Sequence, residues 1–156
     1  MDARETQTNA LRTLYVATGG ASWANRLGWL GAEPACQWHG VGCDDRGAVS
    51  SLRLPANVLS GTVPPEVGDL ASLGVLFLPR NSKLAGTAPS QLGKLSALTF
   101  LALDDNRLSG TIPVQLSKLS MLSKLGLDDS RISGTVPAEL SLLSNLTQLY
   151  LDYTST

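Results

Sequence analysis

Side chains that could act as nucleophiles or general bases are few in this sequence. His39 is the single histidine, so a Ser/His/Asp arrangement could use no other base. It stands between two cysteines in a glycine-containing segment, where a turn histidine is the simpler interpretation. The glycines recur at turns and do not form a phosphate-binding loop between a strand and a helix. We therefore predict that the chain is not an enzyme and has no catalytic residue, metal site or cofactor.

The two cysteines could have three states. Cys36 and Cys43 flank a short segment with Trp38 and two glycines, which can bring their Cβ atoms to disulfide distance. A zinc site of Cys36, His39 and Cys43 would lack the fourth ligand of a structural site. Two free buried thiols are the third possibility. We favour the disulfide, which would indicate an oxidising compartment.

One further motif bears on the compartment. Asn145 begins an Asn-Leu-Thr sequon, the acceptor for N-glycosylation in secreted proteins. The residues after Met1 are charged and polar, so we expect no secretory signal in this segment. Together with the cysteine pair, the sequon favours a secreted or extracellular location.

Length and composition restrict the class of protein. The chain has 156 residues, 43% of them hydrophobic, and a formal net charge of -1, as expected for one ordered domain. Lys and Arg total 12 against 13 Asp and Glu, so we expect no nucleic-acid partner. No apolar run approaches the ~20 residues of a membrane span. Leucine is exceptional at 29 residues, which indicates one packing arrangement used repeatedly.

A repeat of 24 or 25 residues accounts for the leucines. The dipeptide Gly-Thr recurs at spacings of 25, 24 and 24 residues, and a proline follows each glycine by three positions. A Leu-x-Leu triplet precedes each dipeptide, and a fifth triplet, Leu149/Leu151, lies near the end. The dipeptides are Gly61-Thr62, Gly86-Thr87, Gly110-Thr111 and Gly134-Thr135.

Each part of the unit has a physical interpretation. Leu-x-Leu is typical of a short strand with both leucines buried, and copies one unit apart must pair in parallel. An asparagine that can bond the neighbouring turn follows at Asn57, Asn81 and Asn106, replaced by Ser130 and Thr154. The glycine permits a tight turn, and the proline limits the last segment to about one or two turns of 3-10 helix.

These units resemble the leucine-rich repeat of the plant-specific subtype, a form also common in algae and protists. The unit from Leu98 to Met121 reads LTFLALDDNRLSGTIPVQLSKLSM, which matches the whole consensus LxxLxLxxNxLSGxIPxxLxxLxx. The segment CxWxGVxC from Cys36 to Cys43 is similar to the capping domain of that family. The resemblance implies a Cys36–Cys43 disulfide. It also implies an α/β repeat fold, a right-handed solenoid with short parallel strands on the concave face and an N-terminal helical cap.

The resemblance covers nearly the whole chain and gives the domain organisation. We expect a capping region at 1–48 and repeats at 49–156 in one continuous solenoid, with units starting near 49, 73, 98 and 122 and a partial unit from 146. Three tryptophans, Trp23, Trp29 and Trp38, are expected to close the first coil. The family usually has a C-terminal cap or more repeats, so we expect this chain to be truncated at the C-terminus.

The candidate binding surface consists of the residues between the repeat leucines of each strand segment, which face outward on the concave face. Two acidic pairs, Asp104/Asp105 and Asp128/Asp129, recur at one repeat position. Paired acids or a calcium site are two interpretations, but a solvated surface row comes first. Aromatic side chains also fall on this outward register, and exposed aromatics are typical interface anchors. The predicted binding surface consists of Phe77, Arg80, Phe100, Asp104, Asp105, Lys124, Asp128, Asp129, Tyr150 and Asp152.

We predict a non-catalytic module that binds a protein or peptide ligand through this face. The resemblance implies roles such as receptor-like signalling ectodomains or inhibitors of secreted enzymes. One alternative is a structural subunit packed against neighbouring subunits of a larger complex through its uncapped C-terminal end. A lower-ranked alternative is an ice- or glycan-binding surface built on the row Thr62, Thr87, Thr111 and Thr135.

Overall fold

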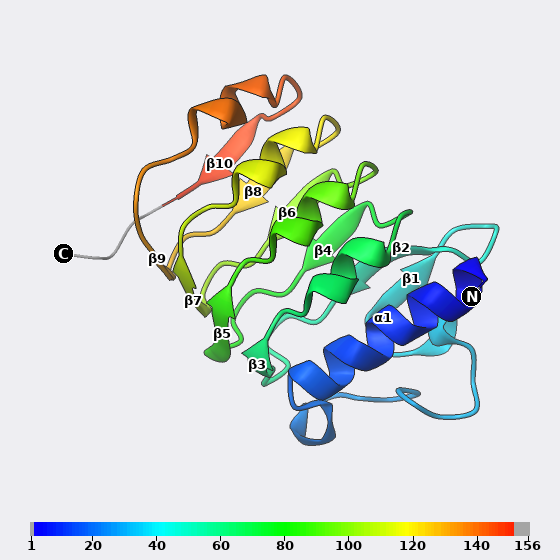
Figure 1. Ribbon diagram of the computed structural model, residues 1–156. Coiled ribbons are helices and arrows are strands. Elements are labelled where there is room, and N and C mark those ends of the chain that lie inside the picture. Colours follow the sequence, from blue (N-terminus) through cyan, green and yellow to red (C-terminus); the bar gives the residue numbers. More distant parts are fainter. Residues whose placement is uncertain (1, 152–156) are drawn as a thin grey trace.

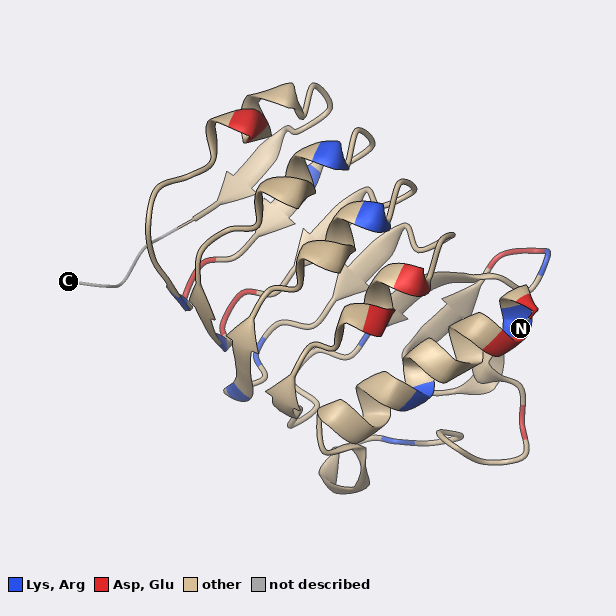
Figure 2. Cartoon of the chain, viewed as in Figure 1, with Lys and Arg blue, Asp and Glu red and all other residues tan. Residues whose placement is uncertain are grey.

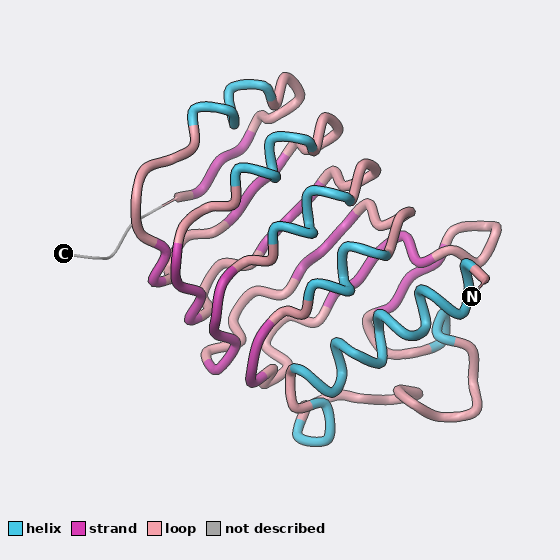
Figure 3. Tube along the Cα trace, in the orientation of Figure 1, coloured by secondary structure: helices cyan, strands magenta, loops and turns pink. Residues whose placement is uncertain are grey.

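The computed structural model of the chain describes residues 2–151. The elements form a stack of similar coils in which strands lie on one side and short 3-10 helices on the other (Figures 1 and 3). The predicted Asp152 and Thr154 lie outside the described residues. Within those residues, no helix is long and apolar enough to cross a membrane.

A six-stranded sheet has one strand from each coil. Its order is β1-β2-β4-β6-β8-β10; β1 is antiparallel to β2 and the other pairs are parallel. Each later strand includes the first leucine of a Leu-x-Leu triplet, and the second leucine follows directly. The bounds are β1 Val41–Cys43, β2 Val49–Arg53, β4 Val75–Phe77, β6 Phe100–Ala102, β8 Lys124–Gly126 and β10 Gln148–Tyr150.

A second sheet, which the sequence did not predict, lies where we expected only turns. It has the order β3-β5-β7-β9 and is parallel throughout. This sheet forms because the repeat places each extended segment beside the equivalent segment of the next unit, where the two can pair. The bounds are β3 Ser60–Thr62, β5 Lys83–Thr87, β7 Arg107–Gly110 and β9 Arg131–Ile132.

The other side of each coil is a 3-10 helix that begins after the repeated proline, as predicted. These helices are η3 Pro65–Asp69, η4 Ser90–Lys94, η5 Val114–Lys118 and η6 Ala138–Leu142. Between them and the six-stranded sheet lies a core of leucines. Leu101 and Leu125 are fully buried, whereas the equivalent Leu149 of the last described coil is 45% exposed. Burial of the repeat leucines therefore depends on a coil stacked on each side.

The first coil is covered by the N-terminal region. Helix α1, Ala3–Ala17, packs beside η3 and buries Leu11, Leu14 and Tyr15. The Asp2 side chain caps the helix by accepting a hydrogen bond from the Glu5 N–H at 2.7 Å. Two further short helices, η1 Gly20–Ser22 and η2 Ala35–Gln37, connect α1 to β1.

An aromatic cluster closes this end, as expected of the tryptophans. Trp29 lies at the centre, with ring centroids 4.7 Å from Trp23, 5.0 Å from Trp38 and 5.8 Å from Tyr15. Each indole N–H donates to a backbone carbonyl, so these large side chains are buried without an unpaired donor. Cys36 and Cys43 are joined as a disulfide, which links η2 to β1.

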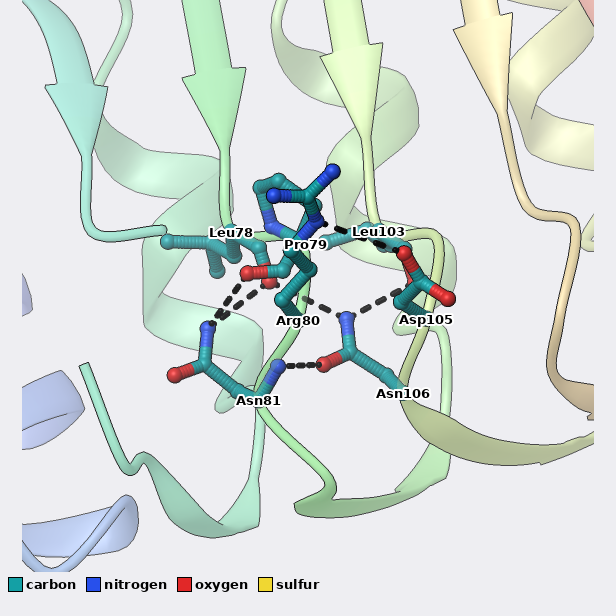
Figure 4. Close-up of polar contacts among 7 residues, drawn as sticks. All are labelled: Leu78, Pro79, Arg80, Asn81, Leu103, Asp105 and Asn106. Carbon is teal, nitrogen blue, oxygen red and sulfur yellow. Dashed lines mark hydrogen bonds and ion pairs between the residues drawn. The ribbon is translucent and has the colours of Figure 1, made fainter. Parts of the chain in front are cut away.

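Buried asparagines connect the coils at the turn after each strand (Figure 4). The Asn81 side-chain oxygen accepts from the backbone N–H groups of Asn57 and Leu59 at 2.9 and 3.1 Å. Its amide nitrogen donates to the carbonyl of Leu54 in the previous coil and that of Leu78 in its own. One side chain therefore satisfies backbone groups of two coils at a place where no strand pairing is available.

The Gly-Thr dipeptide interlocks successive coils on the other flank. Gly86 has a φ of 78°, and a Cβ there would lie 2.8 Å from the Thr62 methyl carbon of the preceding coil. Gly110 has the same relation to Thr87 at 2.9 Å. The glycine is therefore required both for its left-handed conformation and for the space that the threonine methyl occupies.

Substituting Asn81 tests the importance of the asparagine contacts. Asn81→Ala removes the side-chain partner of two buried N–H groups and of the Leu54 carbonyl, so we expect it to lower the free energy of unfolding by about 2–5 kcal/mol. The matched control is Asn145→Ala, because Asn145 is exposed and donates to the Ser120 carbonyl only. We expect a loss within about 1 kcal/mol for the control. Urea denaturation of both variants measures the difference, and equal losses would contradict it.

Candidate functional site

The six-stranded sheet has one face toward the leucine core and one open face. Strand pairing aligns a row of buried leucines across the sheet, with an outward row on each side of it. The first outward row is Ser51, Val75, Phe100, Lys124 and Gln148. The second is Arg53, Phe77, Ala102, Gly126 and Tyr150.

The open face contains a hollow of about 200 Å³, which we call the face hollow. Its base lies where the second row has small residues, Ala102 and Gly126, between the larger Phe77 and Tyr150. Ala102 is only 2% exposed although it points outward, because the larger side chains around it cover it. The lining residues are Phe77, Phe100, Ala102, Asp104, Lys124, Gly126, Asp128 and Tyr150.

Three aromatic rings and an ammonium group line the face hollow, and we call them the aromatic wall. The rings of Phe77 and Phe100 lie 5.6 Å apart between centroids. The Lys124 ammonium lies 4.9 Å from the Phe100 ring centroid and 5.2 Å from that of Tyr150. Both distances are within the range of cation–π attraction.

Two carboxylates, those of Asp104 and Asp128, also line the face hollow, and we call them the carboxylate wall. Asp104 and Asp128 occupy the same position in successive coils, one residue after a buried leucine. Burial raises the pKa of Asp104, and the nearby negative charges of Asp128 and Asp105 raise it further. A hydrogen bond from its own backbone and the Lys124 charge act in the opposite direction. The face hollow thus holds two close carboxylates that repel each other when both are ionised.

Three of the predicted residues lie outside the face hollow. Arg80, Asp105 and Asp129 have positive φ values of 61°, 54° and 48°, so they form the turns after the strands. Arg80 Nε lies 3.7 Å from Asp105 Oδ2 in a largely exposed ion pair (Figure 4). In each acidic pair the first residue, Asp104 or Asp128, lines the face hollow, whereas the second, Asp105 or Asp129, lies on the turn at its edge.

Sequence reasoning missed the two small residues at the base of the face hollow. Ala102 and Gly126 stand between the leucines of successive triplets, where the neighbouring units have Phe77 and Tyr150. This change from large to small and back was visible in the aligned units. The change indicates a hollow only once strand pairing places these four residues in one row.

Two other surfaces are less specific. A wide groove of about 820 Å³ lies on the flank and is lined by Thr62, Thr87, Thr111, Pro89 and Pro113, among others. In the described part of the chain, the 3-10 helices carry acidic residues on η3 and η6 and basic ones on η4 and η5 (Figure 2). Neither surface combines aromatic and charged side chains as the face hollow does.

Comparison with known proteins identifies the repeats. The Leucine Rich Repeat family model matches residues 97–119. The BIR2 ectodomain from Arabidopsis thaliana is 32% identical with a TM-score of 0.81, over 90% of this chain and 76% of that one. This chain belongs to the leucine-rich repeat family. The predicted family and the α/β repeat fold are therefore confirmed.

Other proteins match over more limited parts of their own length. A plant ice-binding protein matches with a TM-score of 0.87 and 30% identity over 94% of this chain and 47% of that one. A plant peptide hormone receptor, RGFR1 in complex with RGF2, matches with a TM-score of 0.66 and 35% identity over 73% and 21%. Polygalacturonase inhibitor 2 of Arabidopsis thaliana is 36% identical over 78 residues, 48% of this chain and 24% of the inhibitor. The chain thus spans about a fifth to a half of the length of these proteins.

The carboxylate wall predicts a pH-dependent effect on stability. Because the folded state raises the pKa of Asp104, ionisation of this side chain opposes folding. The loss of stability is absent below the pKa of the unfolded chain, ~3.9. It grows as the pH rises through the higher pKa of the folded chain. We expect Asp104→Asn to raise the thermal unfolding midpoint at pH 7 and to lose this advantage at pH 3.

Thermal unfolding followed by circular dichroism at both pH values measures the effect. The control at pH 7 is Asp69→Asn, which removes an exposed ion pair with Lys94 on the other side of the solenoid. The control is expected to change stability by less than about 1 kcal/mol. A lower midpoint for Asp104→Asn than for the unmodified chain at pH 7 would contradict the assignment.

Proposed function

We propose that this chain is a non-catalytic recognition module that binds an extended protein segment or peptide on the open face of the six-stranded sheet. The observation that carries the proposal is the face hollow, where aromatic and charged side chains surround a recess on an otherwise regular surface. Exposed aromatic residues beside a recess are the usual anchors of protein recognition. The disulfide and the similarity to receptor ectodomains support an extracellular location.

The size of the face hollow supports a peptide rather than a small molecule. Pockets for drug-sized ligands measure ~300–1,000 Å³, whereas this hollow of about 200 Å³ suits a single side chain. The surrounding strands are ~4.8 Å apart, so five of them span only ~20 Å. This footprint falls below the ~800 Å² per partner of a stable globular interface. An extended segment uses such a narrow surface more completely than a folded protein does.

Similarity to known proteins supports the same class of ligand. RGFR1 is a plant peptide hormone receptor in complex with RGF2. The aromatic anchors and the recess give this chain a surface suited to such a ligand, and we propose that Phe77, Phe100 and Tyr150 are the apolar contacts.

Glycosylation at Asn145 stays a prediction. This residue is exposed, and its side-chain nitrogen donates to the Ser120 carbonyl.

Peptide display tests this proposal directly. A library of random dodecapeptides is selected on the immobilised chain, and the recovered peptides are measured by isothermal titration calorimetry. We expect Phe100→Ser with Tyr150→Ser to weaken binding at least about tenfold, because they remove two aromatic anchors. The control is Gln91→Ala, a substitution in the flank groove, which we expect to leave binding unchanged. Failure to recover binders, or equal binding by the double variant, would contradict the proposal.

Ice binding is a second candidate, favoured by a different surface. Thr62, Thr87, Thr111 and Thr135 are exposed, one per coil, and the first three place their methyl groups on the glycine of the next coil. This arrangement presents a repeated threonine row at roughly the ~4.8 Å strand spacing. The similarity to a plant ice-binding protein supports this alternative, which the sequence alone favours less than peptide binding.

Thermal hysteresis separates the second candidate from the first. If the threonine row binds ice, the chain will show a gap between melting and freezing temperatures that is lost in Thr87→Lys, because a long charged side chain interrupts the row. Ser96→Lys is the control, since Ser96 is exposed and lies outside the flank groove. Absence of hysteresis at millimolar concentration, or its persistence in Thr87→Lys with an unchanged circular dichroism spectrum, would exclude this surface.

A further inference from the structure

We propose that the face hollow is a pocket for one arginine side chain of the bound segment. This inference rests on the proposed function and adds the chemical class of residue that the open face selects. It follows from the shape of the hollow, from the charge of one wall and from the aromatic rings of the other.

The shape of the face hollow suits a long, planar group. Phe77 and Tyr150 are three strands apart in one row, a separation of ~14 Å at the usual strand spacing. Ala102 and Gly126 between them leave the base open. A Cβ at Gly126 would lie 3.0 Å from the Asp104 Oδ1, so this carboxylate extends over the base of the hollow. A residue with a side chain at Gly126 would occupy the space directly in front of that carboxylate.

The carboxylate wall supplies the acceptors that a guanidinium requires. In the described part of the chain, the ion pairs are Arg80–Asp105 and Lys94–Asp69, so neither Asp104 nor Asp128 is in one. Two carboxylates one coil apart can accept several N–H donors from a single planar cation, and guanidinium–carboxylate pairs are among the strongest hydrogen-bonded contacts. Binding a cation would also relieve the repulsion that raises the pKa of Asp104.

The aromatic wall is already in contact with a cation. The Lys124 ammonium lies over the rings of both Phe100 and Tyr150. These rings therefore already attract a positive charge within the face hollow. A guanidinium can stack on such a ring and bond a carboxylate at once, whereas a compact ammonium cannot do both as well.

Lys124 competes with the ligand for these rings. The lining of the face hollow has two carboxylates and one ammonium, so its net charge favours a cation. A bound guanidinium must nevertheless share the aromatic wall with a like charge. Removal of the lysine charge should therefore strengthen the binding of arginine, which is the opposite of what loss of a structural contact would do.

The probe for the test is N-acetyl-arginine amide, titrated into the full chain labelled with nitrogen-15. We expect saturable shifts of the amide signals of Ala102 and Gly126. The matched controls are N-acetyl-citrulline amide, which has a similar shape without charge, and N-acetyl-glutamate amide; we expect at least about tenfold weaker responses to both. A response to citrulline equal to that for arginine, or no response to any probe, would overturn the inference.

Three variants assign the response to the face hollow. We expect Asp104→Asn with Asp128→Asn to weaken binding about tenfold or more, and Lys124→Met to strengthen it about three- to tenfold by removing a like charge. Asp69→Asn removes an acidic side chain on η3 and is expected to change nothing. Weaker binding in Lys124→Met, with a dispersed spectrum that shows an intact fold, would contradict the competition.

The peptide selection distinguishes this inference from the proposed function. Recovered peptides that depend on Phe100 and Tyr150 but show no excess of arginine would leave peptide binding standing and refute the arginine pocket. Arginine-rich peptides that lose affinity with the two asparagine substitutions would support both. If no peptide binds the open face, the proposed function fails as well.

Discussion

The stack depends on satisfying the backbone at the turns between coils. The short strands of the six-stranded sheet end after a few residues, and beyond them the chain has buried N–H and carbonyl groups without a ladder partner. Asn81 supplies those partners for two coils at once, and Asn106 does the same one coil later by accepting from the Asn81 N–H and donating to the Leu78 carbonyl. Without such side chains, stacking identical leucine layers would bury unpaired polar groups, whose cost would offset much of the apolar gain.

The same constraint separates the positions that hold the fold from those free to recognise a ligand. Leucine, asparagine, glycine and proline occupy repeat positions that contact the adjacent coils. The side chains of the outward rows contact one another only on the open face, outside the leucine core, so they can differ from coil to coil. The sequence of sizes from Phe77 through Ala102 and Gly126 to Tyr150 is one such variation, and the face hollow is its result.

Much of the fold could be predicted from the sequence because a repeat is a local pattern. The Leu-x-Leu strands, the asparagine contacts and the 3-10 helices all follow from residues within one unit, and the tryptophan cluster follows from the need to close the first coil. The second sheet could not be seen in one unit, because it depends on the pairing of extended segments between units. The site was predicted in part: Phe77, Phe100, Lys124 and Asp128 are brought together, whereas Asp105 and Asp129 lie on turns because their backbones are left-handed.

The row that forms the face hollow has a consequence for changes in repeat number. Whole coils of this kind could be gained or lost without loss of the leucine contacts, since the coils present equivalent leucines to their neighbours, and the asparagine recurs at Asn57, Asn81 and Asn106 before Ser130 replaces it. A recognition pocket made by one coil would survive such an event. This one draws on four coils in fixed order, so deletion of the coil that carries Ala102 would place Phe77 directly beside Gly126 and close half of the recess. The fold can therefore tolerate a change in the number of coils, whereas the same change would alter the face hollow and with it the binding specificity.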